Sequence, residues 1–164
     1  MTAPSACQWA LTTRSPDETQ ALGRLLGEAS EPDSLVLLTG ELGAGKTCFS
    51  QGVAAGLGVQ EQVTSPTFIL AAEYQGRLPL YHLDLYRIEA PEEAADLDLD
   101  RFLGGRAVTL VEWAERALGL WPEDHLTIVF SHRLGEERDL MIKAGGPRSR
   151  SLLQGLRRRW TSLP

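Results

Sequence analysis

An eight-residue run that follows a short apolar stretch constrains this chain more than any other part of its sequence. The run is Gly40, Glu41, Leu42, Gly43, Ala44, Gly45, Lys46 and Thr47, and the four residues at 35–38 are Leu-Val-Leu-Leu. It matches at every required position the pattern of a phosphate-binding loop, which lies between a buried strand and a helix. Backbone N–H groups and the helix dipole attract phosphate oxygens there, Lys46 reaches the β- and γ-phosphates, and Thr47 ligates Mg²⁺. The run therefore predicts an α/β fold that binds ATP with Mg²⁺.

The flanking sequence predicts the other elements of such a fold. Ser15, followed by Pro16 and by Glu18 three residues on, is typical of a helix start. Apolar runs predict strands at residues 8–13, 35–38, 69–74, 78–83, 108–111, 126–130 and 140–143. Helices are expected from residue 16, at 46–57, at 91–95 and at 149–160. Together these elements predict a P-loop NTPase-type three-layer sandwich with a mixed, mostly parallel central sheet, in which a short connection at 75–77 makes a hairpin.

The whole chain is expected to form one domain, residues 1–164, and to end in a basic segment. Residues from about 145 to 164 form a helix or tail, for which we expect a solvated face or a frayed end.

The net charge of −6 argues against a chain that binds DNA or RNA by itself, since that affinity comes mainly from Lys and Arg on phosphates. Two distant cysteines fit a reducing compartment, and no apolar run approaches the roughly 20 residues that span a bilayer. We expect a cytoplasmic protein with no DNA or membrane partner.

Two acids close predicted strands that neighbour the loop. Asp84 ends the run at 80–83, and Glu112 ends the run at 108–111. Ligands of open α/β sheets bind at strand ends, and Mg²⁺ prefers oxygen donors, so both carboxylates are candidate metal ligands beside Thr47. Hydrolysis also needs an oriented water, and we assign Asp84 mainly to Mg²⁺ and Glu112 to metal or water, with the roles open to exchange. Solvent-facing loop acids are the alternative interpretation. Lys46 completes the catalytic set.

A hydroxyl-rich segment follows the predicted loop helix at residues 64–68. Thr64, Ser65 and Thr67 are candidate members of a switch loop that senses the γ-phosphate. The alternative is a turn ordered by Pro66 and capped by its hydroxyls. His82 is expected to be a packed or hydrogen-bonded core residue, not a proton carrier.

Two other classes of function remain compatible with these residues. A small-molecule kinase uses the same phosphate cradle but needs an acceptor pocket and commonly an Arg-bearing lid, and the sequence contains no clear lid segment. A non-enzymatic switch subunit would regulate partners through its bound nucleotide alone. Phosphate release, measured with and without partners or small acceptors, separates these hypotheses.

Four motifs, taken together and in this order, resemble the TsaE family of bacterial ATPases in tRNA threonylcarbamoyladenosine biosynthesis. They are the loop at 40–47, Thr-Ser-Pro-Thr-Phe at 64–68, His-Leu-Asp-Leu-Tyr-Arg at 82–87 and Val-Glu-Trp at 111–113. The likeness covers roughly residues 13–143. It implies an ATPase that joins the TsaD–TsaB pair and supports threonylcarbamoyl transfer to adenosine 37 of tRNA without performing the transfer. The tRNA is then contacted only indirectly, through these partners.

The resemblance also implies roles for single residues. It places Mg²⁺ near Thr47 and Glu112, makes Asp84 important for hydrolysis and assigns Thr67 and its neighbours to a nucleotide-responsive loop. For the adenine side it indicates the entry at Ser15 and the strand near Arg138. Cys48, where the family commonly has a hydroxyl or aliphatic residue, completes the expected nucleotide-binding set.

Overall fold

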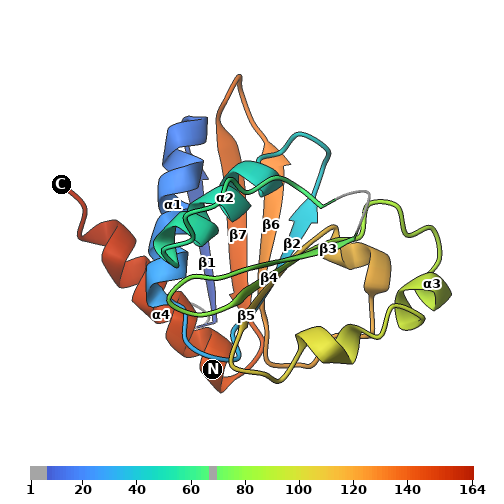
Figure 1. Cartoon of the computed structure of the whole chain (residues 1–164). Coiled ribbons are helices and arrows are strands. Elements are labelled where there is room, and N and C mark those ends of the chain that lie inside the picture. Colours follow the sequence, from blue (N-terminus) through green and yellow to red (C-terminus); the bar gives the residue numbers. More distant parts are fainter. Residues whose placement is uncertain (1–6, 67–69) are drawn as a thin grey trace, which may run out of the picture.

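A seven-stranded sheet forms the centre of the molecule, as a computed structural model that describes residues 7–66 and 70–164 shows (Figure 1). The strands are β1 (Gln8–Thr13), β2 (Leu35–Gly40), β3 (Ala71–Tyr74), β4 (Leu80–Asp84), β5 (Val108–Glu112), β6 (Leu126–His132) and β7 (Arg138–Ala144). Their order across the sheet is β1-β7-β6-β2-β5-β4-β3. The predicted strands are thus confirmed within a few residues at their ends; Ile69, where the third was expected to begin, lies outside the described residues.

The sheet is mixed, as the sequence predicts. Strands β6, β2, β5 and β4 pair in parallel at the centre, whereas β1–β7, β6–β7 and β3–β4 pair antiparallel towards the edges. Strands β1, β2, β4, β5 and β6 therefore run in one direction, and β3 and β7 oppose them. The loop strand β2 is central, and β5 lies between it and β4. This order brings the carboxyl ends of β2, β5 and β4 side by side.

Helices cover both faces of the sheet and complete three layers. Helices α1 (Pro16–Ala29), α2 (Lys46–Gly56) and α4 (Pro147–Thr161) lie on one side, and the short helix α3 (Pro91–Ala95) lies on the other (Figure 1). Two 3-10 helices, η2 (Leu99–Phe102) and η3 (Ala114–Ala117), pack on the α3 side. Alternation along β2 divides the core: Val36 and Leu38 face α1 and α2, whereas Leu35 and Leu37 face α3. The predicted three-layer sandwich is confirmed.

Helix α1 begins where the sequence predicts, and it packs against α2 at unusually close range. The Ser15 side chain caps α1 by accepting a hydrogen bond from the Glu18 N–H at 3.2 Å. Glycines then form the contact between the helices. A Cβ on Gly23 would lie 2.3 Å from the Phe49 carbonyl oxygen, and one on Gly52 would lie 2.1 Å from that of Gln20. Only hydrogen side chains allow the two backbones to approach so closely.

The carboxyl-terminal segment is a packed helix. Of the two forms expected, a helix or a tail, the helix is confirmed and the frayed end is wrong. Helix α4 begins two residues earlier than predicted, at Pro147, and buries Leu152, Leu153 and Leu156 against the sheet. Asp124 accepts hydrogen bonds from the backbone N–H groups of Arg148 and Ser149 at its first turn. The prediction of a solvated basic face holds for the opposite side, where Arg157 and its two following arginines are exposed. No helix in residues 7–66 and 70–164 is both long enough and apolar enough to cross a membrane.

Candidate functional site

The glycine-rich loop joins the end of β2 to the start of α2, in the strand–loop–helix arrangement that its sequence predicts. Gly40 has a φ of 129° and Gly45 a φ of 105°, conformations that favour glycine. A Cβ at Gly40 would also lie 2.2 Å from the Phe130 carbonyl oxygen of the neighbouring strand β6. A cavity of about 230 Å³ opens over the loop, lined by Leu42, Gly43, Gly45, Lys46, Thr47, Cys48, Glu112 and Trp113. The loop and the end of β5 thus share one cavity.

Lys46 lies in this loop with its ammonium held by backbone carbonyls. Its Nζ donates to the carbonyl oxygens of Gly40 at 2.6 Å and Glu41 at 2.9 Å, and it lies 3.8 Å from the centre of the Trp113 ring. Burial lowers the pKa of Lys46, while the charges of Glu115, Glu112, Asp84 and Glu41 act in the opposite direction. The loop therefore holds one cation at the point where the predicted phosphates would arrive.

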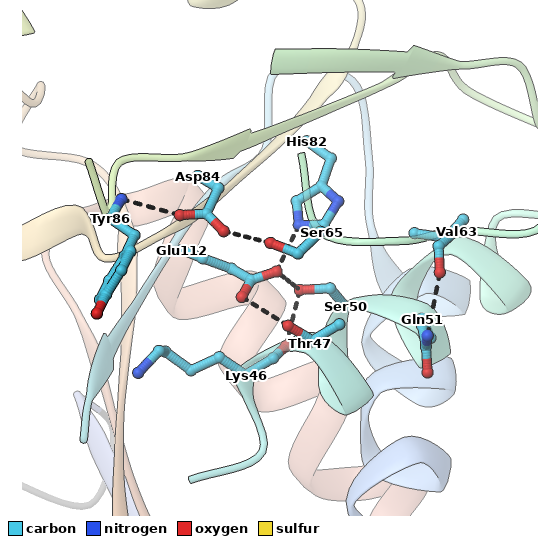
Figure 2. A network of polar contacts seen from close by, with 10 residues as sticks. All are labelled: Lys46, Thr47, Ser50, Gln51, Val63, Ser65, His82, Asp84, Tyr86 and Glu112. Carbon is cyan, nitrogen blue, oxygen red and sulfur yellow. Dashed lines mark hydrogen bonds and ion pairs between the residues drawn. The ribbon is translucent and has the colours of Figure 1, made fainter. Parts of the chain in front are cut away.

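Glu112 is buried at the end of β5, and both of its carboxylate oxygens accept hydrogen bonds (Figure 2). Its Oε1 accepts from the Thr47 hydroxyl at 3.0 Å. Its Oε2 contacts the Ser50 hydroxyl at 3.2 Å and the His82 Nε2 at 2.6 Å. Thr47 and Ser50 belong to α2, and His82 belongs to β4. Side chains from two elements, α2 and β4, thus fix the Glu112 carboxylate beside the loop, and Glu112 is not a solvent-facing acid.

Asp84 lies next to Glu112 because β4 and β5 pair in register. The two residues are direct partners in the parallel ladder, and Asp84 is 2% exposed. Its Oδ1 accepts from the Tyr86 N–H at 2.9 Å, and its Oδ2 accepts from the Ser65 hydroxyl. The structure therefore connects the candidate switch segment to a site carboxylate through Ser65. Thr64 is exposed, and Thr67 lies outside the described residues.

Ser15 and Arg138, expected on the adenine side, and Cys48, expected in the nucleotide-binding set, each have protein partners. The Ser15 hydroxyl oxygen caps α1, and the Cys48 Sγ contacts the Pro16 carbonyl oxygen at 3.2 Å, so Cys48 joins α2 to the start of α1. Burial raises the pKa of the Cys48 thiol, and Asp17 adds to this effect. Arg138, at the start of β7, donates to the Gly43 carbonyl oxygen at 3.4 Å. Their contacts with a nucleotide stay predictions.

Two residues of this site were assigned no role from the sequence: Trp113 was named only as part of the motif at 111–113, and Glu115 was not named. Trp113 directly follows β5 with a φ of 60°, and its ring covers Lys46. Glu115, in η3, accepts from the Gly40 N–H at 3.4 Å through Oε2, while its Oε1 is buried without a hydrogen-bond partner among the described residues. Glu115 lies one helical turn beyond Glu112, the acid that ends β5. A search for acids that included the turn after each strand would have found it.

Fold and site together define an α/β protein with a mixed seven-stranded sheet and a glycine-rich loop between its central strand and a helix. The chain belongs to the TsaE family, because residues 13–140 match the family described as "Threonylcarbamoyl adenosine biosynthesis protein TsaE". The resemblance inferred from the four motifs is thereby confirmed, and the chain is a member of a family of tRNA threonylcarbamoyladenosine biosynthesis proteins.

Individual relatives agree with this assignment over most of the chain. The protein of that name from Bacillus subtilis (strain 168) is 42% identical over 147 residues, which span 89% of this chain and 92% of the relative. The one from Treponema pallidum (strain Nichols) is 46% identical over 116 residues, 71% of this chain and 86% of the relative. The crystal structure of Bacillus subtilis YdiB superposes with a TM-score of 0.78 at 37% identity and covers 93% of this chain and 95% of YdiB.

Proposed function

We propose that this protein is a Mg²⁺-dependent ATPase subunit that supports threonylcarbamoyl transfer to adenosine 37 of tRNA by a TsaD–TsaB complex. It does not perform the transfer itself. It works in the cytoplasm, its hydrolysis is weak alone and is stimulated by the partner proteins, and these partners contact the tRNA. Membership of the TsaE family supports the pathway. The site geometry supports the ATPase.

One observation carries the ATPase proposal: the contact of the Thr47 hydroxyl with the Glu112 carboxylate inside the loop cavity. A hydroxyl and a carboxylate are the hard oxygen donors that Mg²⁺ takes in sites where phosphates and waters supply the other ligands. No cluster of three or more His, Cys, Asp or Glu in residues 7–66 and 70–164 could hold a metal by itself. In this proposal the metal arrives with a nucleotide and is held by Thr47 and Glu112, with Asp84 beside them.

The loop residues supply the proposed phosphate site. The backbone N–H groups from Gly43 to Thr47 lie at the amino terminus of α2, where the helix dipole favours anions. Two of the three Lys46 N–H groups are taken by loop carbonyls, which aims the ammonium and leaves donor capacity for a phosphate oxygen. When bound, Mg²⁺ neutralises charge that develops on the phosphates during hydrolysis.

The acids of β4 and β5 have separate proposed tasks. Glu112, fixed by its hydrogen bonds, holds the metal or a water. Asp84, joined to Ser65, makes the site responsive to residues 64–68, since a change in that segment would alter the hydrogen bonding of Asp84. This connection offers a physical route by which partner proteins could stimulate hydrolysis.

The test measures phosphate release from ATP by the protein alone, with TsaD and TsaB, and with candidate small acceptors. We expect partner-stimulated release that is lost in Glu112→Ala and kept in Glu31→Gln, an exposed acid at the opposite end of β2. Phosphate transfer to a small acceptor without partners would overturn the proposal in favour of a kinase. Nucleotide binding without turnover under all conditions would favour a switch subunit instead.

A further inference from the structure

His82 lies in the middle of β4 with its side chain fully buried. Its Nε2 is 2.6 Å from Glu112 Oε2, which is the shortest of the contacts that Glu112 makes with Thr47, Ser50 and His82. The other ring nitrogen, Nδ1, is buried and has no hydrogen-bond partner among the described residues. Figure 2 shows the ring directed at Glu112 from the β4 side. A polar ring in this position has one polar contact, and that contact is a site carboxylate.

The hydrogen bond can be assigned a direction from these neighbours. A proton on Nδ1 would be a buried donor without an acceptor, and a ring with both nitrogens protonated would bury that donor together with a charge. A proton on Nε2 instead has the Glu112 carboxylate as its acceptor. The neutral ring with Nε2–H therefore fits the site, and His82 donates to Glu112.

Of the two groups that contact Glu112 Oε2, only His82 is dedicated to it. The Ser50 hydroxyl has a single proton, and it lies nearer to the Lys46 carbonyl oxygen, at 2.8 Å, than to Glu112, at 3.2 Å. The Thr47 hydroxyl contacts the other carboxylate oxygen and is itself a proposed metal donor. The His82 Nε2–H is thus the donor that neither the helix backbone nor the metal competes for.

We propose that His82 is a positioning residue that orients the Glu112 carboxylate and thereby sets how strongly Mg²⁺ tightens nucleotide binding. It acts through Glu112 and does not touch the nucleotide. Groups that orient metal-binding side chains typically change metal affinity or activity by about 10- to 100-fold when they are lost. The inference rests on the proposed Mg²⁺–ATP function, and it concerns only the coupling between the metal and the nucleotide.

Two amide substitutions separate the donor from the bulk of the ring. The Gln side-chain nitrogen reaches approximately the place of the His Nε2, whereas the Asn nitrogen reaches approximately that of Nδ1. His82→Gln therefore keeps a donor to Glu112, and His82→Asn loses it. Both place an uncharged amide at the same buried position, which makes each the control for the other.

The experiment measures the affinity of a non-hydrolysable ATP analogue in MgCl₂ and in EDTA for each variant. In the wild type we expect tighter binding in MgCl₂. In His82→Asn the ratio of the affinity in MgCl₂ to that in EDTA should fall by about tenfold or more, while the affinity in EDTA stays unchanged. In His82→Gln this ratio should stay within about threefold of the wild-type ratio. Ser50→Ala should also stay within about threefold, because its proton serves the Lys46 carbonyl. If the Asn variant does not fold, His82→Leu, which also lacks a donor to Glu112, replaces it in the comparison with His82→Gln.

Each other outcome contradicts a specific statement. Equal tightening in His82→Asn and the wild type would overturn the positioning role, as would equal losses in His82→Asn and His82→Gln. A loss in Ser50→Ala as large as that in the His82 variants would show that Ser50 is the effective donor. Absence of any Mg²⁺ effect in the wild type would overturn the proposed function itself, whatever the variants do.

Discussion

The Thr47 hydroxyl donates a hydrogen bond of 3.0 Å to Glu112 Oε1 and thereby joins the first turn of α2 to the end of β5. The two residues are far apart in sequence, and they meet because β5 pairs in parallel with the loop strand β2. Leu38 and Glu112 are partners in that ladder. The glycine-rich loop and the acid beside it are therefore held in one geometry by the sheet register.

Substitution at Thr47 tests this contact. Thr47→Ser keeps the hydroxyl, and Thr47→Val replaces it with a methyl group of similar volume. We expect the Val variant to lose about 100-fold in Mg²⁺-dependent ATP hydrolysis, since it removes both a proposed metal donor and the hydrogen bond to Glu112. The Ser variant should lose no more than about fivefold. Steady-state phosphate release over a range of Mg²⁺ concentrations checks this, and equal rates for the two variants would contradict it.

Ser65 should affect turnover more than nucleotide affinity. Its hydroxyl donates to Asp84 Oδ2, so Ser65→Ala removes this hydrogen bond between residues 64–66 and the β4 acid. A hydrogen bond to a charged group contributes about 1.5–3 kcal/mol, and we expect a roughly tenfold lower kcat in the presence of partners with little change in KM. Thr64→Ala, at the exposed neighbouring position, is the control. A change confined to KM would place Ser65 in binding instead.

The parts of the fold that the sequence predicts are those fixed by local patterns. The Ser15 cap, the apolar run of β2 and the loop glycines specify their own conformations, because capping, strand burial and positive φ are demands of a few neighbouring residues. The pairing of Asp84 with Glu112 was expected only as two acids at strand ends. The two acids are direct partners because β4 pairs with β5, which in turn pairs with β2. No local sequence pattern predicts which strands pair or in which register.

The missed features depend on contacts between distant segments. Nothing near Glu115 indicates that its carboxylate meets the Gly40 N–H, because the contact requires η3 to fold back on the loop. The packing of α4 was underestimated for a similar reason. Its arginines dominate the local composition, but Leu152, Leu153 and Leu156 find an apolar surface supplied by the rest of the core.

The pH dependence of nucleotide binding should report on Lys46 and Glu115. Burial lowers the pKa of Lys46, and Glu115 is first among the acids that act to raise it. The ammonium exists below its pKa, so phosphate binding should weaken as pH rises through a value below the ordinary 10.5 of lysine. Glu115→Gln removes one raising charge while its amide oxygen can still accept from Gly40. The loss of affinity should then begin at lower pH than in the wild type.

A titration of nucleotide affinity from neutral to alkaline pH checks the direction of this change. Glu123→Gln, an exposed acid, is the control and should leave the midpoint in place. A midpoint that moves to higher pH in Glu115→Gln would contradict the electrostatic role of Glu115.

Asp124 should stabilise the protein at neutral pH and lose this effect in acid. Burial alone would raise the pKa of Asp124, but hydrogen bonds from Ser149 and Arg148 outweigh it and hold the pKa below the usual 3.8. A carboxyl with a depressed folded pKa contributes stability that is present above its unfolded pKa and lost as pH falls through its folded pKa. Asp124→Ala should cost about 1–2 kcal/mol at neutral pH, as expected for a helix cap.

The check is urea unfolding at a series of pH values. The difference between wild type and Asp124→Ala should shrink as pH falls below the ordinary carboxyl range. Glu136→Ala, at an exposed position, should show no such dependence. A difference that stays constant into strong acid would show that the Asp124 charge does not cap α4.

Gly52→Ala should destabilise the protein, although alanine usually stabilises a helix relative to glycine. In an exposed helix interior, Gly→Ala gains about 0.5–1 kcal/mol. At Gly52 the added Cβ would lie 2.1 Å from the Gln20 carbonyl oxygen and 3.0 Å from the Arg24 nitrogen, both backbone atoms of α1. The helices would have to separate, and overpacking of this kind costs about 3 kcal/mol.

The matched control is Gly155, also inside a helix. Its added Cβ would meet the flexible end of Arg159 at 3.3 Å and the Ala29 Cβ at 3.8 Å, so Gly155→Ala should be neutral or gain up to about 1 kcal/mol. Urea unfolding midpoints of the two variants decide the matter. If Gly52→Ala unfolds at the same midpoint as Gly155→Ala, the backbones of α1 and α2 do not pack at the distance described.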